Sequence, residues 1–149
     1  MTDIAPCLMF VGDQAGRAEQ AMELYVSLFG DAEIRQVERF GPDEEESGVT
    51  FARFRLAGRE FRAMDRGAPH AFTFTPALSF WVECGSEAEV ERAFAGLSEG
   101  GSVLMPWDPA PGPDDLPSAA EVHRDHAALP GPLEDVEAGL EEGYRTTLW

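Results

Sequence analysis

Three histidines are the side chains best suited to acid–base or metal chemistry near neutral pH. His70 lies in the segment APHAFTFT, directly before a strand-like run. A neutral imidazole there could exchange a proton with a ligand or hydrogen-bond the backbone of the segment. His123 and His126 are three residues apart, with Asp125 between them and Glu121 nearby, a spacing that could chelate a metal ion on a helix. The prolines that flank this pair favour a solvated loop instead.

Nucleophilic catalysis and phosphate binding find no support in the sequence. No serine or cysteine stands in a turn of the type that exposes a nucleophile, and the GDQAG segment at 12–16 is too short for a phosphate-binding loop and contains no lysine. Cys7 and Cys84 lie in or at the end of strand-like runs. We expect buried free thiols, with a disulfide between the two as the alternative.

The chain is strongly acidic. Its 28 acidic residues and 11 basic residues, all of the latter arginine, give a net charge of −17 over 149 residues. Such a field repels nucleic acid, and it suits either a cationic ligand or solubility alone. The N-terminal MTDIAP lacks the pattern of a secretion signal, and no apolar stretch approaches the ~18 residues of a membrane span. We therefore expect a cytoplasmic protein without a membrane or nucleic-acid partner, folded as a single domain over 1–149.

The elements that must position these residues occur twice in the sequence. PCLMFVG returns as PALSFWV, and an amphipathic helix and a strand-like run follow each copy. Ser86 followed by Glu89 is a capping box that begins the second helix. The expected elements are, in order, 6–12, 17–30 and 33–37 in the first copy and 76–82, 86–101 and 102–106 in the second.

Three strands are predicted after the first helix. The first of them covers 32–40, and VTFARFRLAG at 49–58 then alternates apolar residues with arginines. A short turn at Ala57 and Gly58 returns the chain as EFRAMD at 60–65, which completes a hairpin. The first copy therefore consists of a strand, a helix and three strands, and the fold class is α+β.

The second copy becomes atypical after residue 106. Seven of the 11 prolines lie in 106–132, and the tail 106–149 has ten acidic residues against two arginines. Proline removes the amides that a central strand requires. Two alternatives remain open for the end of the tail: an acidic helix over 132–145, or a short edge strand formed by YRTTLW at 144–149.

Residues 4–107 resemble a known family. AMELYVSLFGDAEI, FRAMDRGAPHAFTFTPALSFWVEC, the capped helix and GGSVLMP are similar to the PhnB-like group, also named for 3-demethylubiquinone-9 3-methyltransferase-like domains. The group belongs to the glyoxalase/bleomycin-resistance (vicinal oxygen chelate) superfamily. The resemblance implies two βαβββ modules whose sheets curl into half-barrels around a cleft, commonly within a homodimer. The first module would cover 4–67, the second would begin over 75–107, and 106–149 would be an atypical acidic, proline-rich tail.

The closing motif of that family is absent. Members usually end with two strands that carry an aromatic–Trp–Val-x-Asp-x-(Phe/Tyr)-Gly-Val-Ser-Trp-Gln type motif, which nothing in 106–149 matches. Either the tail closes the second half-barrel differently, or the reading frame has diverged from the family after about Pro106. Methyl transfer would also require a cofactor-binding glycine motif in a longer α/β domain, and the sequence has none.

The resemblance also implies where a metal ion would bind. In metal-dependent members of the superfamily, His, Gln and Glu side chains converge from the first and last strands of the two modules. The two first-strand positions fall at about Pro6 and Thr75, which are not suitable ligands. The last strand of the first module offers Glu60 and Asp65. We expect no metal ion and no cofactor.

A cleft with apolar walls then remains as the expected site, which suits a planar or apolar small molecule. We expect a small-molecule-binding protein, with catalysis unproven and the ligand cationic if the surface charge selects it. The alternatives are a metal-assisted lyase, isomerase or dioxygenase of the glyoxalase type, and an interaction module that uses the tail. The predicted ligand-binding residues are Phe10, Met64, Phe74 and Trp81 on the walls, with Asp65 and His70 at the edge.

Overall fold

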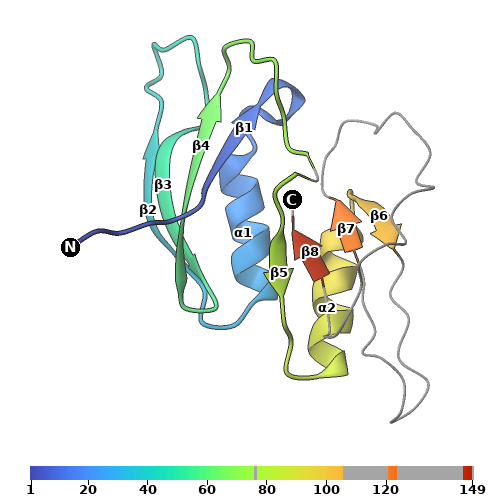
Figure 1. Cartoon of the computed structure of the whole chain (residues 1–149). Helices are drawn as coiled ribbons and strands as arrows, with labels where there is room; N and C mark the ends of the chain where they lie inside the picture. Colours follow the sequence, from blue (N-terminus) through green and yellow to red (C-terminus); the bar gives the residue numbers. More distant parts are fainter. Residues whose placement is uncertain (76, 106–120, 124–145, 149) are drawn as a thin grey trace. The chain divides into compact units, whose positions relative to one another are not determined.

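A computed structural model describes residues 1–75, 77–105, 121–123 and 146–148 (Figure 1). For Leu104, Met105 and the two short C-terminal segments it describes the backbone alone. The chain divides into two compact units, residues 1–74 and 75–149.

The first unit contains one helix and four strands in the order that the sequence predicted. A short 3₁₀ turn over Gly12–Gln14 connects the first strand to the helix. The periodic patterns of the sequence therefore place every element of this unit correctly. The elements are β1 (Cys7–Val11), α1 (Ala18–Leu28), β2 (Glu33–Arg39), β3 (Val49–Leu56) and β4 (Arg59–Arg66).

The four strands form one sheet in the order β1-β4-β3-β2 (Figure 1). β1 runs parallel to β4, and the two other neighbouring pairs are antiparallel. Ala57 and Gly58 connect β3 to β4 with φ values of 46° and 76°. Two consecutive positive φ values are typical of the tight hairpin turn whose twist matches that of the strands, so the predicted hairpin is confirmed.

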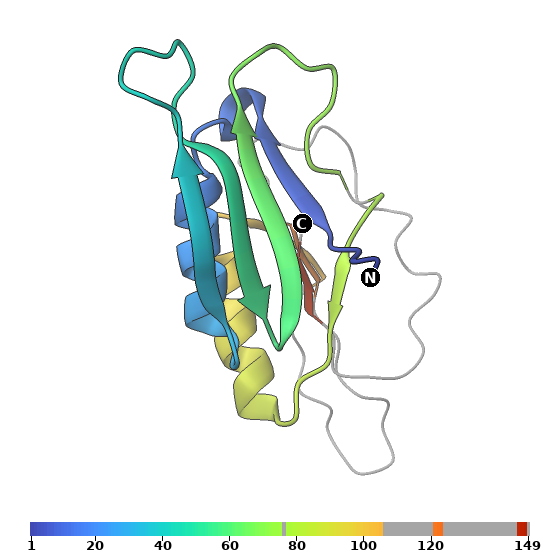
Figure 2. The same cartoon turned by 90° about the vertical axis from the view of Figure 1, so that its left-hand side faces the viewer.

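Helix α1 covers one face of this sheet (Figure 2). Because side chains alternate along a strand, every second residue of each strand points toward the helix. Burying these apolar side chains is the main favourable contribution to folding, at about 25 cal/mol per Å² of apolar surface. The buried side chains of this core include Leu8, Phe10, Ala52, Phe54, Phe61 and Ala63 from the strands and Met22, Tyr25 and Leu28 from the helix.

β1 differs from the strand that its continuous apolar run predicted. The run CLMFV is typical of a strand buried on both faces, but Cys7 is exposed and Met9 is only half-buried. The reason is that α1 packs on one side of the sheet only. The predicted burial of the Cys7 thiol is therefore wrong, and Cys84 is half-buried. Both thiols are free.

The second unit has a helix with the predicted cap. The Glu89 N–H donates to Ser86 Oγ at 3.3 Å, and the Glu89 carboxylate accepts from the Gly85 N–H at 2.8 Å. The Ser86 half of the capping box is thus confirmed, while the reciprocal bond reaches one residue further back. The described elements of this unit are β5 (Phe80–Val82), α2 (Glu87–Ser98), β6 (Ser102–Met105), β7 (Glu121–His123) and β8 (Thr146–Leu148).

Two strands occur where the sequence predicted none or left the structure open. β7 includes His123, at a position where a loop was expected, and it pairs antiparallel with β6. β8 pairs antiparallel with β5, which agrees with the strand alternative for 144–149. Asp125, His126 and the possible helix over 132–145 lie outside the described residues.

The described strands of the second unit do not reproduce the sheet of the first. They form two separate two-stranded sheets, and β5 and β8 are antiparallel where β1 and β4 are parallel. The element order is nevertheless again a strand, a helix and three strands. The chain is therefore a mixed α+β protein with two helices and a four-stranded sheet in its described part, and a second βαβββ module stays a prediction. Neither helix of that described part is long and apolar enough to cross a membrane.

Candidate functional site

The sheet face that turns away from α1 is the candidate site, because it combines charged and apolar side chains that the core does not use. We call it the outer face. Its members alternate along the strands with the residues that point toward the helix. They include Cys7 and Met9 on β1, Glu33, Arg35, Gln36 and Glu38 on β2, Phe51, Arg53 and Arg55 on β3, and Glu60, Arg62 and Met64 on β4.

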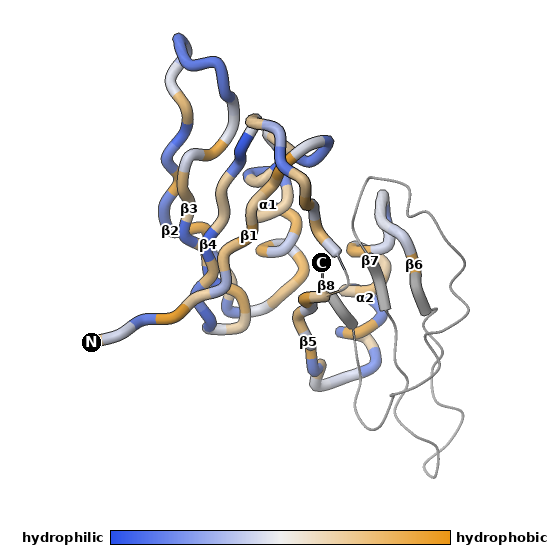
Figure 3. Tube along the Cα trace, turned by 45° about the horizontal axis from the view of Figure 1, so that its top comes forward, coloured by the Kyte–Doolittle hydropathy of each residue, from blue (hydrophilic) through white to orange (hydrophobic). Residues whose placement is uncertain are grey.

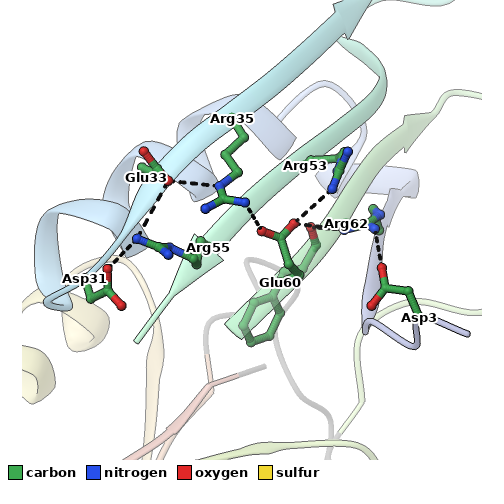
Figure 4. A network of polar contacts seen from close by, with 9 residues as sticks. Asp3, Asp31, Glu33, Arg35, Arg53, Arg55, Glu60 and Arg62 are labelled. Carbon is green, nitrogen blue, oxygen red and sulfur yellow. Dashed lines mark hydrogen bonds and ion pairs between the residues drawn. The ribbon is translucent and has the colours of Figure 1, made fainter. Parts of the chain in front are cut away.

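Glu60 lies at the centre of a charged network on this face (Figure 4). Its Oε1 is 2.8 Å from Arg35 Nη1, an ion pair whose angles do not make a hydrogen bond. Its Oε2 accepts from Arg62 Nη1 at 3.3 Å and lies 3.6 Å from Arg53 Nη2. One carboxylate is therefore shared by three guanidinium groups. The side chains of Glu60 and Arg62 are only 22% and 19% exposed, which strengthens their mutual attraction.

The other acids of the network lie at its rim. Arg62 donates to Asp3 at 3.1 Å, and Arg55 pairs with Asp31 (Figure 4). The Asp3 and Asp31 side chains are 67% and 60% exposed, so solvent weakens both pairs. In the described part of the chain, the Nε atoms of Arg53 and Arg55 are buried without a hydrogen-bond partner. Two donors of this face therefore have no acceptor among the described residues.

An apolar group adjoins the charged network on the same face. Met9 is the register partner of Met64, and Phe51 precedes Ala52, which pairs with Ala63. The side chains of Met9, Phe51 and Met64 are all half-buried. The outer face thus has an apolar end and an arginine-rich end, an arrangement suited to a ligand with an apolar body and a polar head.

Cys7 adds a thiol to this face. Its register partner on β4 is Arg62, at the edge of the charged network. Partial burial raises the pKa of the Cys7 thiol, and the nearby positive charges of Arg62 and Arg66 oppose that rise. Because the thiol is exposed, it can report whether a ligand covers the outer face.

Asp65, predicted at the edge of the cleft, points to the opposite side of the sheet and is fully buried. Its Oδ1 accepts from the N–H groups of Gly16 and Ala18, at 2.8 and 3.2 Å, and its Oδ2 accepts from the Val49 N–H at 2.8 Å. Ala18 is the first residue of α1, whose N-cap residue Arg17 makes no side-chain capping bond. Asp65 therefore replaces the missing cap and links the helix to two strands.

The predicted ligand-binding residues do not gather at one point of the first unit. Phe10 is 3% exposed and packs edge-on against Phe74, with ring centroids 5.0 Å apart, on the same side of the sheet as Asp65. Met64 lies on the outer face. His70 is exposed and stacks at a tilt on Phe72, 4.9 Å between centroids. Trp81 is 47% exposed in the second unit. Their role in ligand binding stays a prediction.

The described residues do not fit the metal site of the superfamily. No group of three or more His, Cys, Asp or Glu side chains that could hold a metal ion occurs among them. The Glu60 carboxylate is engaged by arginines, and the Asp65 carboxylate by backbone amides. Pro6 contributes only its carbonyl oxygen, which accepts from the Arg62 N–H at 2.8 Å. The oxygen donors that the resemblance implies are therefore committed to other partners.

Sequence reasoning missed the arginine network, although a signal for it was present. Arg53 and Arg55 alternate with apolar residues along one strand, and Glu60, Arg62 and Met64 do so along the next. The alternation predicts that these residues share one face. The register of the two strands decides which charged residues lie opposite each other. In the structure, Arg53 lies opposite Arg62 and Arg55 lies opposite Glu60, and the alternation alone does not give this register.

Comparisons with known proteins agree on one family. The family model described as 3-demethylubiquinone-9 3-methyltransferase matches residues 2–114. A solved structure from Bacillus cereus, described as a PhnB protein and candidate 3-demethylubiquinone-9 3-methyltransferase, is 31% identical, with a TM-score of 0.73 over 99% of this chain and 98% of that one. Protein PA1353 from Pseudomonas aeruginosa has the same fold at 22% identity, with a TM-score of 0.66 over 99% and 96% of the two chains. No curated protein matches the chain.

Proposed function

The chain belongs to the PhnB-like family of the glyoxalase/bleomycin-resistance superfamily, described as 3-demethylubiquinone-9 3-methyltransferase, and from this premise we propose that it binds a small molecule on the outer face of the β1–β4 sheet without a metal ion. The observation that carries the proposal is the shared Glu60 carboxylate beside unpaired, buried arginine donors. Polar groups left without partners in a half-buried position are unfavourable unless a ligand or water satisfies them.

The family fold supports this position. The resemblance implies sheets that curl into half-barrels around a cleft, and a sheet face covered by its own helix cannot line that cleft. The face of this sheet that carries no helix of its own unit is the outer face (Figure 2). Its apolar end at Met9, Phe51 and Met64 would contact the body of a ligand, and its arginines would orient the polar part.

Metal independence is supported by the donor set. Glu60 would have to leave three arginines, and Asp65 three amides, before either could bind a metal ion. The metal-assisted lyase, isomerase or dioxygenase is therefore the less favoured candidate. Methyl transfer is carried over only from the names of the family and of the Bacillus cereus relative, and no residue described above supports it.

Ligand binding can be tested with a library of small molecules on protein dialysed against EDTA. A Cys84→Ser background leaves Cys7 as the only thiol. We expect compounds that raise the midpoint of thermal unfolding also to slow the alkylation of Cys7, before and after dialysis alike. Loss of binding after EDTA treatment would overturn metal independence. Compounds that bind and leave the rate of Cys7 alkylation unchanged would overturn the position of the site.

The cationic ligand, the homodimer and the interaction role of the tail stay predictions. The cationic ligand rests on the net charge of the chain, and the homodimer rests on the resemblance. An interaction role for the tail concerns residues 106–149, most of which lie outside the described residues. Deleting 106–149 tests that role, because a docking segment would be needed for a co-purifying partner and not for small-molecule binding at the outer face.

A further inference from the structure

We propose that the small molecule is an amphipathic anion, whose carboxylate or phosphate group binds Arg53 and Arg62 in place of Glu60. Its apolar body would lie over Met9, Phe51 and Met64. This inference rests on the proposed function, since it names the class of ligand for the same site. It departs from the cationic ligand that the net charge of −17 suggests.

Arg53 is the least satisfied cation of the network. Its Nη2 lies 3.6 Å from Glu60 Oε2, beyond a good hydrogen bond, and its Nε is buried without a partner in the described part of the chain. Arg35 and Arg62 share the same carboxylate at 2.8 and 3.3 Å. An anionic head at this point would supply the acceptors that Arg53 lacks.

The remaining acids of the network do not compete strongly for these arginines. Asp3, which accepts from Arg62, is 67% exposed, and Glu33, which accepts from Arg35 at 2.9 Å, is 52% exposed. Ion pairs at such exposure contribute little to stability, because water and salt screen them. An anionic ligand that also buries apolar surface can therefore displace them at little cost.

The apolar end determines the shape of the ligand. Arg62 and Met64 are two residues apart on β4 and point to the same face, and Met9 lies beside Met64 through the β1–β4 register. An anionic head at Arg53 and Arg62 therefore places an attached ring or short chain on the methionines and Phe51. A free inorganic anion would lack this second contact.

The overall acidity of the chain does not oppose such a ligand at short range. Charges further away than the Debye length of about 8 Å are largely screened at physiological salt. The groups within reach of the head are three arginines and the one carboxylate of Glu60, so the local charge still favours an anion. Distant acids would slow its arrival more than they would weaken its binding.

The charge of the ligand can be tested with three probes of one shape: benzoate, benzamide and benzylamine. Their dissociation constants for the EDTA-dialysed protein are measured by NMR titration, and Cys7 alkylation shows whether each covers the outer face. We expect benzoate to bind at least about tenfold more tightly than the other two, and to slow the alkylation. If benzylamine binds more tightly than benzoate and protects Cys7, the anionic ligand is wrong and the site stands. If no probe binds on this face, both proposals fail for this class of ligand.

Two variants separate the role of the arginines from general charge. We expect Arg53→Gln to weaken benzoate binding about tenfold, whereas Arg39→Gln, which removes the same charge from an exposed pair with Glu19, leaves it unchanged. We expect Glu60→Gln to tighten benzoate binding roughly threefold or more, because it removes the competing carboxylate. Far-ultraviolet circular dichroism checks that each variant is folded. Weaker binding in a folded Glu60→Gln variant would overturn the proposed competition.

Discussion

Asp65 contributes to the fold of the first unit through three hydrogen bonds, each of which its carboxylate accepts from a backbone N–H. The Gly16 amide lies just before α1, the Ala18 amide is at its first residue, and the Val49 amide is at the first residue of β3. A single side chain on β4 thus fixes the helix and the neighbouring strand to each other. Because the group is fully buried, water cannot substitute for it.

Replacing Asp65 by alanine should therefore destabilise the protein. We expect Asp65→Ala to lower the free energy of unfolding by about 3 kcal/mol, since it leaves buried amides without an acceptor. Urea unfolding followed by circular dichroism measures this change. Asp43→Ala, at an exposed position of the β2–β3 connection, is the control and should stay within about 0.5 kcal/mol of the wild type. Equal effects of the two substitutions would contradict the structural role of Asp65.

Gly48 lies so close to the Asp65 carboxylate that a larger residue does not fit at this position. Its φ is +97°, and an added Cβ would lie 2.4 Å from Asp65 Oδ2 and 3.1 Å from Gly16 Cα. We expect Gly48→Ala to lower the free energy of unfolding by about 2 kcal/mol or more, through backbone strain and through the displaced carboxylate. Gly30→Ala is the matched control, because no atom lies within 4 Å of its added Cβ and its φ is ordinary. The double variant Gly48→Ala/Asp65→Ala should lose less free energy of unfolding than the sum of the two single losses, because both act through the same carboxylate.

At the scale of elements, α1 is held to the sheet by its core face and by a pair at its first turn. Arg39 at the end of β2 donates to Glu19 of α1, and this hydrogen bond lowers the pKa of the Glu19 carboxyl. A carboxyl whose pKa is lower in the folded protein stabilises it above the pKa of the unfolded chain. That contribution is lost as the pH falls through the lowered pKa.

The pH dependence of stability should reflect this pair. We expect Glu19→Gln to be slightly less stable than the wild type at neutral pH, and the difference to shrink as the pH falls below the ordinary range of a glutamate. Thermal unfolding at a series of pH values measures the difference, with Glu45→Gln on the exposed connection as the control. A difference that grows toward acid pH would contradict the assigned sign.

The elements of the first unit could be predicted from periodicity, whereas their partners could not. The apolar steps of α1 and the alternation of β3 and β4 are local signals, so the order and approximate bounds of the elements follow from them. That Phe10 belongs to the core while Met9 lies on the outer face depends on which side of the sheet α1 covers, which CLMFV does not encode. The role of Asp65 likewise depends on amides 16 to 49 residues away along the chain.

In the second unit, the proline-rich composition after residue 106 did not predict the strands that form there by pairing with β6 and β5. Prolines after residue 106 argue against central strands, yet β7 and β8 form at segments without proline and pair with β6 and β5. Short strands of three residues carry too few alternating positions to be recognised in a sequence. The capped start of α2 was predictable because the signal lies within four residues.

At the scale of the whole molecule, charge is distributed unevenly. The connection between β2 and β3 is strongly hydrophilic (Figure 3), and acidic residues dominate the chain. Seven of the 11 arginines, in contrast, lie on β2, β3 and β4. The sheet is therefore the part of this acidic protein that most favours the binding of an anion. The net charge of the whole chain does not show this local excess of arginine.

The outer face is proposed to bind an anionic small molecule without a metal ion. The Nε–H signals of the arginines on this face test the proposal most directly. Nitrogen-15 NMR of EDTA-dialysed protein, titrated with benzoate, follows Arg53 and Arg55, assigned through Arg53→Gln and Arg55→Gln. The Arg53 signal should move along a saturating curve, because its donor gains an acceptor, and the Arg55 signal from the same face should follow the same curve, while the signal of exposed Arg39 stays in place. Signals of Arg53 and Arg55 that stay unmoved while benzoate binds elsewhere, or that move only when a divalent metal ion is restored, would contradict the account.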